Sequence, residues 1–491
     1  MYSRIEKIDK INTIEKFDLI VIGGGASGLG VALDAVSRKM KVLLLEKYDF
    51  GKGTSSKATK LLHGGVRYLA QGDIGLVKEA LAERSFVLKN ASHLSNVQEF
   101  VIPFYSIWQG YYYLTGLKLY DFMSFGKSLG PTSMISKSAV VKKIPNINPN
   151  GLKGGIVYYD GQFDDARLCI DLVKTIEREG GMCINYFEFV DFKFDASGKI
   201  NGITTFDQLS GISYAHTCDV VVNATGVWSD ELMNKAGNSD LEIVPARGSH
   251  IVVDNKFLGG QSAIMIPKTS DGRVLFIIPW KNKSIIGTTD IIAEKVEADP
   301  KITEEEINFM LENAKAYLQN DVKRADILST YAGLRPLVKS KSNKQSTKEI
   351  SRNHKVVQSA SGLFSILGGK WTTFRKMGED TLDAVQRVHS KFNFPSKSNE
   401  LLIEKSKNYT DDQIHPGLPY TWLQLEEICK EEMVETLEDL LARRTRCLFL
   451  DKKATLSLVE KVAHMMRNIK NKDRVWEQNQ INVFMDIIQN F

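Results

Sequence analysis

The sequence predicts an α/β protein with a parallel sheet, a second antiparallel sheet and a helical C-terminal domain. Three observations carry this prediction. An apolar strand, a glycine-rich turn, a helix and a second strand follow one another within residues 17–45. Alternating apolar and polar segments between residues 250 and 287 are typical of antiparallel strands. Beyond residue 394, the chain changes to charged segments with helical periodicity.

Composition sets broad limits. The chain has 491 residues, 43% hydrophobic and 25% charged, as expected of an ordinary globular protein of roughly three domains. A net charge of +5 is too small to indicate nucleic acid, although it suits an anionic substrate or an acidic membrane surface. The five cysteines are scattered, without a CxxC pair, so no metal site or disulfide framework is predicted and a reducing compartment is favoured. No apolar run reaches the ~18 residues that span a bilayer, so we expect any membrane contact to be peripheral.

The first elements form a Rossmann-like βαβ unit. The apolar run Phe17–Ile22 reads as a strand, Leu29–Arg38 as a helix and Lys41–Leu45 as the next strand. Between them, the glycines of Gly23–Gly28 permit a tight turn, close approach of a pyrophosphate and close helix–strand packing. Such a turn alone is weak evidence, but its position between a strand and a helix makes nucleotide binding the favoured interpretation. Glu46 ends the second strand and is predicted to bind a free ribose 2′-hydroxyl, which favours FAD or NAD over NADP.

Three segments follow this unit. Residues 49–65 are polar and irregular, and Gly75–Asn90 reads as an amphipathic helix. Residues 100–129 are crowded with aromatic side chains. For them we favour a packed core or cavity wall, with membrane docking as the alternative.

The predicted antiparallel strands are His250–Asp254, Val274–Pro279 and Ser284–Gly287. Asp219–Asn223 and Leu363–Leu367 read as further strands, the second followed by a helix over Thr373–Val388. Residues 395–412 are polar and linker-like, and two helical stretches are expected at Trp422–Cys447 and Thr455–Ile481. We therefore divide the chain into a nucleotide-binding region, 1–394, in which two subdomains interleave, and a helical domain, 395–491.

Several longer motifs closely resemble the FAD-dependent glycerol-3-phosphate dehydrogenases. The resemblance runs in consistent order from Phe17 to Glu379, and Glu438–Thr445 resembles the helical C-terminal domain of that family. The motifs are Gly53–Lys57, Leu62–Leu69, Arg247–His250, Ile278–Trp280, Ile286–Asp290, Tyr331–Pro336 and Gly368–Thr373.

The resemblance implies a flavoprotein like glutathione reductase and D-amino-acid oxidase, with FAD lying against an antiparallel-sheet substrate domain. It implies oxidation of sn-glycerol 3-phosphate to dihydroxyacetone phosphate, with electrons passed to quinone or, in an oxidase branch, to oxygen. The chain length favours the quinone-linked branch. A quinone acceptor in turn implies a cytoplasmic protein that attaches peripherally to the inner face of the cell membrane. A homodimer is compatible with the resemblance, and nucleic acid is not an expected partner.

The resemblance also marks candidate substrate contacts. His250 is the expected proton acceptor because an imidazole titrates near neutrality, and Arg335 is expected to stabilise the developing alkoxide. His63 is expected either to share the role of proton acceptor or to pack against the flavin. The planar guanidinium group of arginine matches the oxygens of a phosphate dianion. Any one of these cations alone would more often form a surface salt bridge. Several cations within or beside matching motifs favour substrate binding instead. The expected substrate-binding residues are His63, Arg67, Tyr68, Arg352 and Lys370.

Cofactor contacts are expected from five segments of the chain. Lys370 is further expected to stabilise the reduced flavin anion. Trp371 stands where many relatives are expected to have a smaller aliphatic residue, and it is expected to alter the pocket shape. The acidic stretch Tyr159–Arg167 resembles a family signature, but a capped turn that begins a helix at Ala166 is the preferred interpretation. The expected FAD contacts are Gly23, Gly25, Ala26, Ser27, Gly28, Glu46, Lys47, Thr54, Ser55, Ser56, Thr225, Gly226, Gly369, Lys370, Thr372 and Thr373.

Two other functions compete with this interpretation. A flavin oxidase of the amino-acid or sarcosine type shares the turn but lacks the paired His-Gly-Gly and Gly-Gly-Lys motifs; reduction of its flavin by an amine would identify it. A nucleotide-binding redox sensor without turnover is the second. Bound FAD that no polyol phosphate reduces would favour the sensor.

Overall fold

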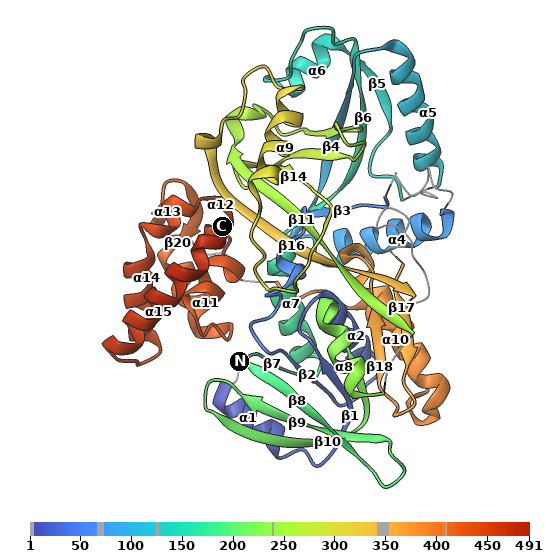
Figure 1. The fold of residues 1–491 in the computed structure, drawn as a ribbon, viewed down its shortest axis with the longest axis vertical. Helices are drawn as coiled ribbons and strands as arrows, with labels where there is room; N and C mark the ends of the chain where they lie inside the picture. The colour runs from blue at the N-terminus through green and yellow to red at the C-terminus, as the bar shows by residue number, and fades with distance from the viewer. Residues whose placement is uncertain are drawn as a thin grey trace.

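Two large sheets and a lateral group of helices make up the protein (Figure 1). The computed structural model describes residues 4–65, 73–123, 127–237, 240–340, 353–405, 407 and 410–491. The parallel sheet and its helices lie at the lower end in Figure 1, and the antiparallel sheet lies at the upper end. The predicted α/β architecture with a helical C-terminal part is confirmed.

The parallel sheet places strand β1 (Phe17–Ile22) between β2 (Val42–Leu45) and β10 (Ile212–Asn223). Helix α2 (Ala26–Ser37) connects β1 to β2, so the predicted βαβ unit is present. The apolar side chains of β1 are buried because helices cover this sheet. β7 (Met182–Ile184) and β18 (Phe364–Leu367) extend the parallel pairing. β8 (Phe187–Phe194), β9 (Ile200–Asp207) and β17 (Lys355–Gln358) join the same sheet through antiparallel pairs. The helices packed around the sheet are α1 (Arg4–Asn12), α7 (Asp165–Arg178), α8 (Ser229–Lys235) and α10 (Phe374–Val388).

The antiparallel sheet is organised by two long strands, β11 (Leu241–Asp254) and β16 (Ile327–Ser340). Their pairing sets His250 opposite Tyr331, and β14 (Lys283–Gly287) flanks β11 on its other side. Within this sheet, β12 and β4 pair in parallel. The remaining members are β3 (Leu61–Leu62), β4 (Ser95–Phe104), β5 (Ser133–Ser136), β6 (Gly154–Phe163), β12 (Ala263–Ile266), β13 (Leu275–Trp280) and β15 (Ile291–Ile292), with α4 (Ile74–Asn90), α6 (Lys137–Lys143) and α9 (Glu304–Lys315) around them.

The aromatic segment divides between the core and the surface. Phe100 and Phe104 of β4 are buried, as the core interpretation predicts. Helix α5 (Ile107–Met123) exposes 83% of Trp108, 74% of Tyr112 and 77% of Phe122, so for these residues the core interpretation is wrong. In Figure 1, α5 runs along the outer edge of the upper sheet. None of the described helices is long and apolar enough to cross a membrane.

The two helical stretches expected near the C-terminus are each divided into shorter elements. Within Trp422–Cys447 the chain forms α11 (Trp422–Glu431) and a π-helical turn at Asp439–Arg444, and α12 (Cys447–Leu450) begins at its end. The stretch predicted as Thr455–Ile481 is likewise divided. Its parts are α13 (Lys452–Leu456), α14 (Val459–Ile469) and α15 (Arg474–Ile487), beside the hairpin β19 (Gln413–His415) and β20 (Leu418–Thr421).

Two smaller expectations are resolved by local contacts. The start of the segment expected to be a linker packs on the first sheet's helices, where the Ser398 hydroxyl donates to Asp34 at 2.7 Å and Ile403 is buried. It is therefore part of the packed structure, because burial offsets the entropy of ordering it. The acidic turn is a helix cap: Asp164 accepts a hydrogen bond from the Arg167 N–H at the start of α7. The preferred interpretation of that turn is confirmed.

Candidate active site

A cavity lies at the carboxyl ends of β1, β2 and β10, where the Gly23–Gly28 turn joins β1 to α2. This is a crevice between neighbouring parallel strands, the usual ligand position in open α/β sheets. Gly28 packs beneath the turn; a Cβ there would lie 1.9 Å from the Gly23 carbonyl oxygen. Gly25 caps α2 without a side-chain hydrogen bond, which leaves the helix N-terminus suited to a pyrophosphate.

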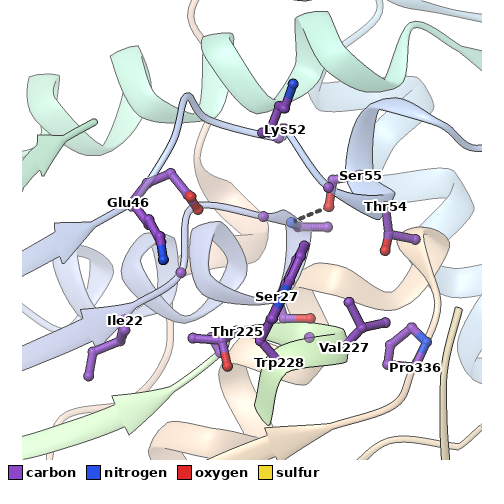
Figure 2. A pocket seen from close by; sticks show the side chains of 18 of the residues that line it. Ile22, Ser27, Glu46, Lys52, Thr54, Ser55, Thr225, Val227, Trp228 and Pro336 are labelled. Carbon is purple, nitrogen blue, oxygen red and sulfur yellow. Dashed lines mark hydrogen bonds between the residues drawn. The ribbon is translucent and has the colours of Figure 1, made fainter. Parts of the chain in front are cut away.

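Glu46 lies beside this turn and lines the same cavity (Figure 2). Its carboxylate accepts hydrogen bonds from the Gly24 N–H at 2.7 Å and the Tyr48 N–H at 2.9 Å. Burial raises the pKa of the Glu46 carboxyl, while these two N–H donors oppose the shift. Each oxygen still has a lone pair for a ribose hydroxyl, because a carboxylate offers about four acceptor positions.

The loop after β2 also lines the cavity, through residues that include Lys52, Thr54 and Ser55 (Figure 2). The Ser55 hydroxyl accepts a hydrogen bond from the Ala26 N–H at 2.9 Å, which ties the loop to the first turn of α2. The Trp371 indole N–H donates to the Ser55 carbonyl at 2.8 Å. Trp371 therefore positions the loop as well as shaping the pocket, a role that the sequence did not indicate.

Most of the expected cofactor contacts line this cavity. Gly28, Ser56 and Thr373 do not: all three are buried beside it. Thr372 lines a second cavity instead. The expected residues that do line the first are Gly23, Gly25, Ala26, Ser27, Glu46, Lys47, Thr54, Ser55, Thr225, Gly226, Gly369 and Lys370.

Several residues that line this cavity were not predicted from the sequence. Trp228 and Glu231 follow β10, Phe189 belongs to β8 and Met377 to α10. No short motif marks them, because their positions depend on how distant elements pack. Lys52 is also in the lining, and its ammonium is 2.6 Å from the Asp299 carboxylate.

A second cavity adjoins the first beside the antiparallel sheet. Expected residues His63, His250, Arg335 and Lys370 all line it. Arg67, Tyr68 and Arg352 lie outside the described residues, so their predicted roles stay predictions. The two cavities share a wall composed of Thr54, Pro336, Gly369, Lys370 and Trp371.

Arg335 is held with its guanidinium at the edge of the second cavity. One terminal nitrogen donates to Asp290 at 2.9 Å and to the Thr289 carbonyl at 3.2 Å, and the other donates to the Thr288 hydroxyl at 3.0 Å. Arg273 also lines the cavity and donates to the Asp290 carbonyl at 3.0 Å. Sequence reasoning missed Arg273, which lies in no quoted motif.

His250 lies deeper than the other expected residues. Only 1% of it is exposed, and its ring stacks on Tyr331 with centroids 4.6 Å apart. Burial, followed by the charges of Lys60 and Arg335, holds the pKa of His250 well below its usual range. The expectation that this imidazole titrates near neutrality is therefore wrong, because both burial and nearby cations disfavour the charged ring.

Comparison with known proteins places this geometry in a family. Residues 18–375 match the family described as FAD dependent oxidoreductase, and residues 364–477 match the C-terminal domain of alpha-glycerophosphate oxidase. The chain is 35% identical to a probable mitochondrial glycerol-3-phosphate dehydrogenase of Dictyostelium discoideum, over 94% of this chain and 84% of that protein.

A Caenorhabditis elegans protein of the same description is 40% identical over 79% of this chain. The match spans 55% of that relative, so the chain covers only about half the length of several curated relatives. The crystal structure of the Bacillus halodurans glycerol-3-phosphate dehydrogenase complexed with FAD superposes with a TM-score of 0.79 at 25% identity, covering 100% of this chain and 98% of that one. The chain belongs to the FAD-dependent oxidoreductases, in the glycerol-3-phosphate dehydrogenase family, and FAD is its cofactor.

Proposed function

We propose that the protein oxidises sn-glycerol 3-phosphate to dihydroxyacetone phosphate and passes the electrons to a membrane quinone. The observation that carries this proposal is the wall shared by the two cavities, which contains Lys370 and Trp371. Lys370 and Trp371 would lie between a cofactor held in the first cavity and a substrate in the second, which Arg335 and Arg273 make cationic. The names of the relatives support the substrate.

FAD, when bound, supplies the two-electron acceptor for the hydride. The Gly23–Gly28 turn and the N-terminus of α2 suit its pyrophosphate, and Glu46 suits its ribose. Ser55 and Thr225 contribute hydroxyls beside that path. We assign the expected cofactor residues that line the cavity to this role.

The second cavity provides charge complementarity for the substrate. Arg335, Lys370 and His63 are assigned to substrate binding, since guanidinium and ammonium groups suit a phosphate dianion. Arg335 is held by Asp290 at 2.9 Å, so its orientation does not depend on the ligand. His250 is assigned as the proton acceptor, neutral before substrate arrives because its pKa is lowered.

A quinone acceptor brings the protein to a membrane surface, and we assign that contact to α5. Its exposed Trp108, Tyr112 and Phe122 are side chains that favour a lipid interface. We accordingly retain peripheral attachment at the inner face of the cell membrane. The division of the chain at 394/395 also remains our proposal.

Anaerobic mixing of the FAD-loaded protein with glycerol 3-phosphate tests the function. We expect rapid bleaching of the flavin absorbance, followed by faster reoxidation with a ubiquinone or menaquinone analogue than with oxygen. Faster reoxidation by oxygen would identify an oxidase instead. Bleaching by an amine but not by glycerol 3-phosphate would contradict the proposed substrate, and no bleaching by any polyol phosphate would favour a redox sensor.

A further inference from the structure

The imidazole of His250 is clamped between two neighbouring strands. On one side it stacks on Tyr331 of β16 with an interplanar angle of 14°. On the other it lies over Gly287 of β14, where a Cβ would come within 2.4 Å of the His250 Cδ2 atom. Both neighbours are its direct cross-strand partners. With 1% of its surface exposed, the ring has little direct access to a substrate.

Thr59 provides the link between this ring and the cavity. Its hydroxyl oxygen lies 2.9 Å from the His250 Nε2 atom, within hydrogen-bonding distance. Thr59 is half-buried and lines the second cavity, whereas His250 is almost wholly buried. A hydroxyl group of a ligand in this cavity therefore reaches the Thr59 oxygen more readily than it reaches Nε2.

The backbone around Thr59 is held on both sides. The preceding Ala58 donates its N–H to Asp165 at 2.9 Å and accepts a hydrogen bond from the Tyr331 hydroxyl at 3.2 Å. The following Lys60 binds Asp165 at 2.7 Å through its buried ammonium. Tyr331 thus fixes both the imidazole, by stacking, and the loop that carries the Thr59 hydroxyl.

The charges around His250 favour a neutral ring in the free protein and protonation once an anion binds. Lys60 and Arg335 are the charged groups that depress its pKa, after burial itself. Burial holds the pKa of the Tyr331 hydroxyl well above its usual range, so that neighbour is neutral too. A phosphate dianion in the cavity counters the two cations and raises the proton affinity of the imidazole.

We propose that Thr59 relays the proton of the substrate hydroxyl to His250. The relay rests on the proposed function. The substrate O–H bond breaks as its proton binds the Thr59 oxygen, and the proton that Thr59 carried moves to Nε2 of His250. The carbon that bears this hydroxyl gives up its hydrogen as a hydride to the flavin. The alcohol thereby becomes a ketone, and the flavin accepts the two electrons. A neutral ring with its proton on Nδ1 is required beforehand, since only then does Nε2 accept.

Two variants of the FAD-loaded protein test the relay. Thr59→Val keeps the side-chain shape but removes the hydroxyl, and Thr59→Ser keeps the hydroxyl as the matched control. We expect Thr59→Val to slow anaerobic flavin reduction about 100-fold, the scale of general acid–base catalysis, and Thr59→Ser to stay close to the parent. FAD content and the affinity for dihydroxyacetone phosphate should not change in either variant.

Isotope effects distinguish a relay from a structural role. In Thr59→Val the solvent deuterium isotope effect on reduction should rise, while the effect of deuterium on the oxidised carbon should fall, because proton transfer becomes limiting. Nitrogen-15 NMR of labelled histidine, with His250→Gln for assignment, should show Nδ1 protonated in the substrate-free parent and a shifted Nε2 signal in Thr59→Val.

Each contrary result has its own meaning. Parent-like reduction by Thr59→Val, or a proton on Nε2 in the parent, would overturn the relay while leaving the proposed function intact. A slow Thr59→Val with unchanged isotope effects would also overturn it, in favour of a structural role. Failure of glycerol 3-phosphate to reduce the parent protein would instead overturn the proposed function, and the relay with it.

Discussion

The guanidinium of Arg444 binds the carboxylate of Asp49 through two hydrogen bonds of 2.5 and 2.8 Å, across 395 positions of the chain. Both side chains are fully buried. Burial would raise the pKa of Asp49, but Arg444 and Arg443 more than offset that and hold it below its usual range. Because Asp49 lies in the loop that continues to Ser55, the C-terminal helices fix one wall of the dinucleotide cavity.

Replacement of Arg444 by Met should destabilise the protein strongly. The Asp49 carboxylate would stay buried with Arg443 but without Arg444 to balance its charge. Breaking a buried ion pair in this way costs about 3–5 kcal/mol. We expect a lower free energy of unfolding in urea and faster loss of FAD. Arg178→Met is the control, since Arg178 and Glu404 are each 41% exposed and such pairs contribute about 1 kcal/mol or less. Equal losses in the two variants would contradict this account.

Gly28→Ala should abolish FAD binding. The new Cβ would lie 1.9 Å from the Gly23 carbonyl oxygen, so the turn must open. Flavin absorbance of the purified variant measures the loss. The matched control is Gly116→Ala in α5, where a Cβ meets nothing within 4 Å and the FAD content should match the parent. Normal flavin content in Gly28→Ala would remove the turn from the cofactor site.

Arg335→Ala should retain FAD yet lose flavin reduction by glycerol 3-phosphate. Removing one donor to a developing alkoxide costs about 10²–10³-fold in rate, and the lost phosphate contact adds to it. Stopped-flow absorbance under anaerobic conditions gives the rate. Lys339→Ala, on the same strand but paired with Glu242 outside both cavities, should reduce normally. Near-normal reduction in Arg335→Ala would place that residue outside the reaction.

The double variant Tyr111→Ser and Tyr112→Ser should release the protein from lipid vesicles. Both aromatic side chains are exposed on α5, and their removal takes away apolar area that binds the interface. Co-sedimentation with vesicles that contain anionic lipid measures the bound fraction. Val475→Ser alters a residue of α15 that is 77% exposed and should bind as the parent does. Unchanged partitioning of the double variant would reject α5 as the contact.

Lys60 should make stability depend on pH. Burial, partly offset by Asp165, lowers the pKa of Lys60 to about 7. Above that pH the unfolded chain binds a proton that the folded protein does not, so this group makes stability rise with pH. The gain approaches about 1.4 kcal/mol per pH unit between pH 7 and 10. Urea unfolding at pH 7, 8 and 9 should show a steeper rise in the parent than in Lys60→Gln; parallel slopes would contradict the assigned pKa.

Local sequence patterns were sufficient for the central βαβ unit. Phe17–Ile22 has the bounds of β1, because a buried parallel strand is a continuous apolar run bounded by a turn. The positions of the Gly23–Gly28 turn and of Glu46 beside the first cavity were predictable for a similar reason, because residues close in the sequence set them. The division of the C-terminal stretches into short helices could not be predicted, since a π-helical turn at Asp439–Arg444 contributes to buried ion pairs that periodicity does not reveal.

The sequence by itself therefore determined the succession of strand, glycine turn, helix and strand, and also the family, because each depends on contiguous residues. Only the tertiary structure decided the seclusion of His250 behind Thr59 and the attachment of Asp49 to Arg444. The physical reason is that burial and charge at these positions come from partners far along the chain. His250 meets Thr59 across 191 positions, and no local pattern encodes that distance or the resulting pKa.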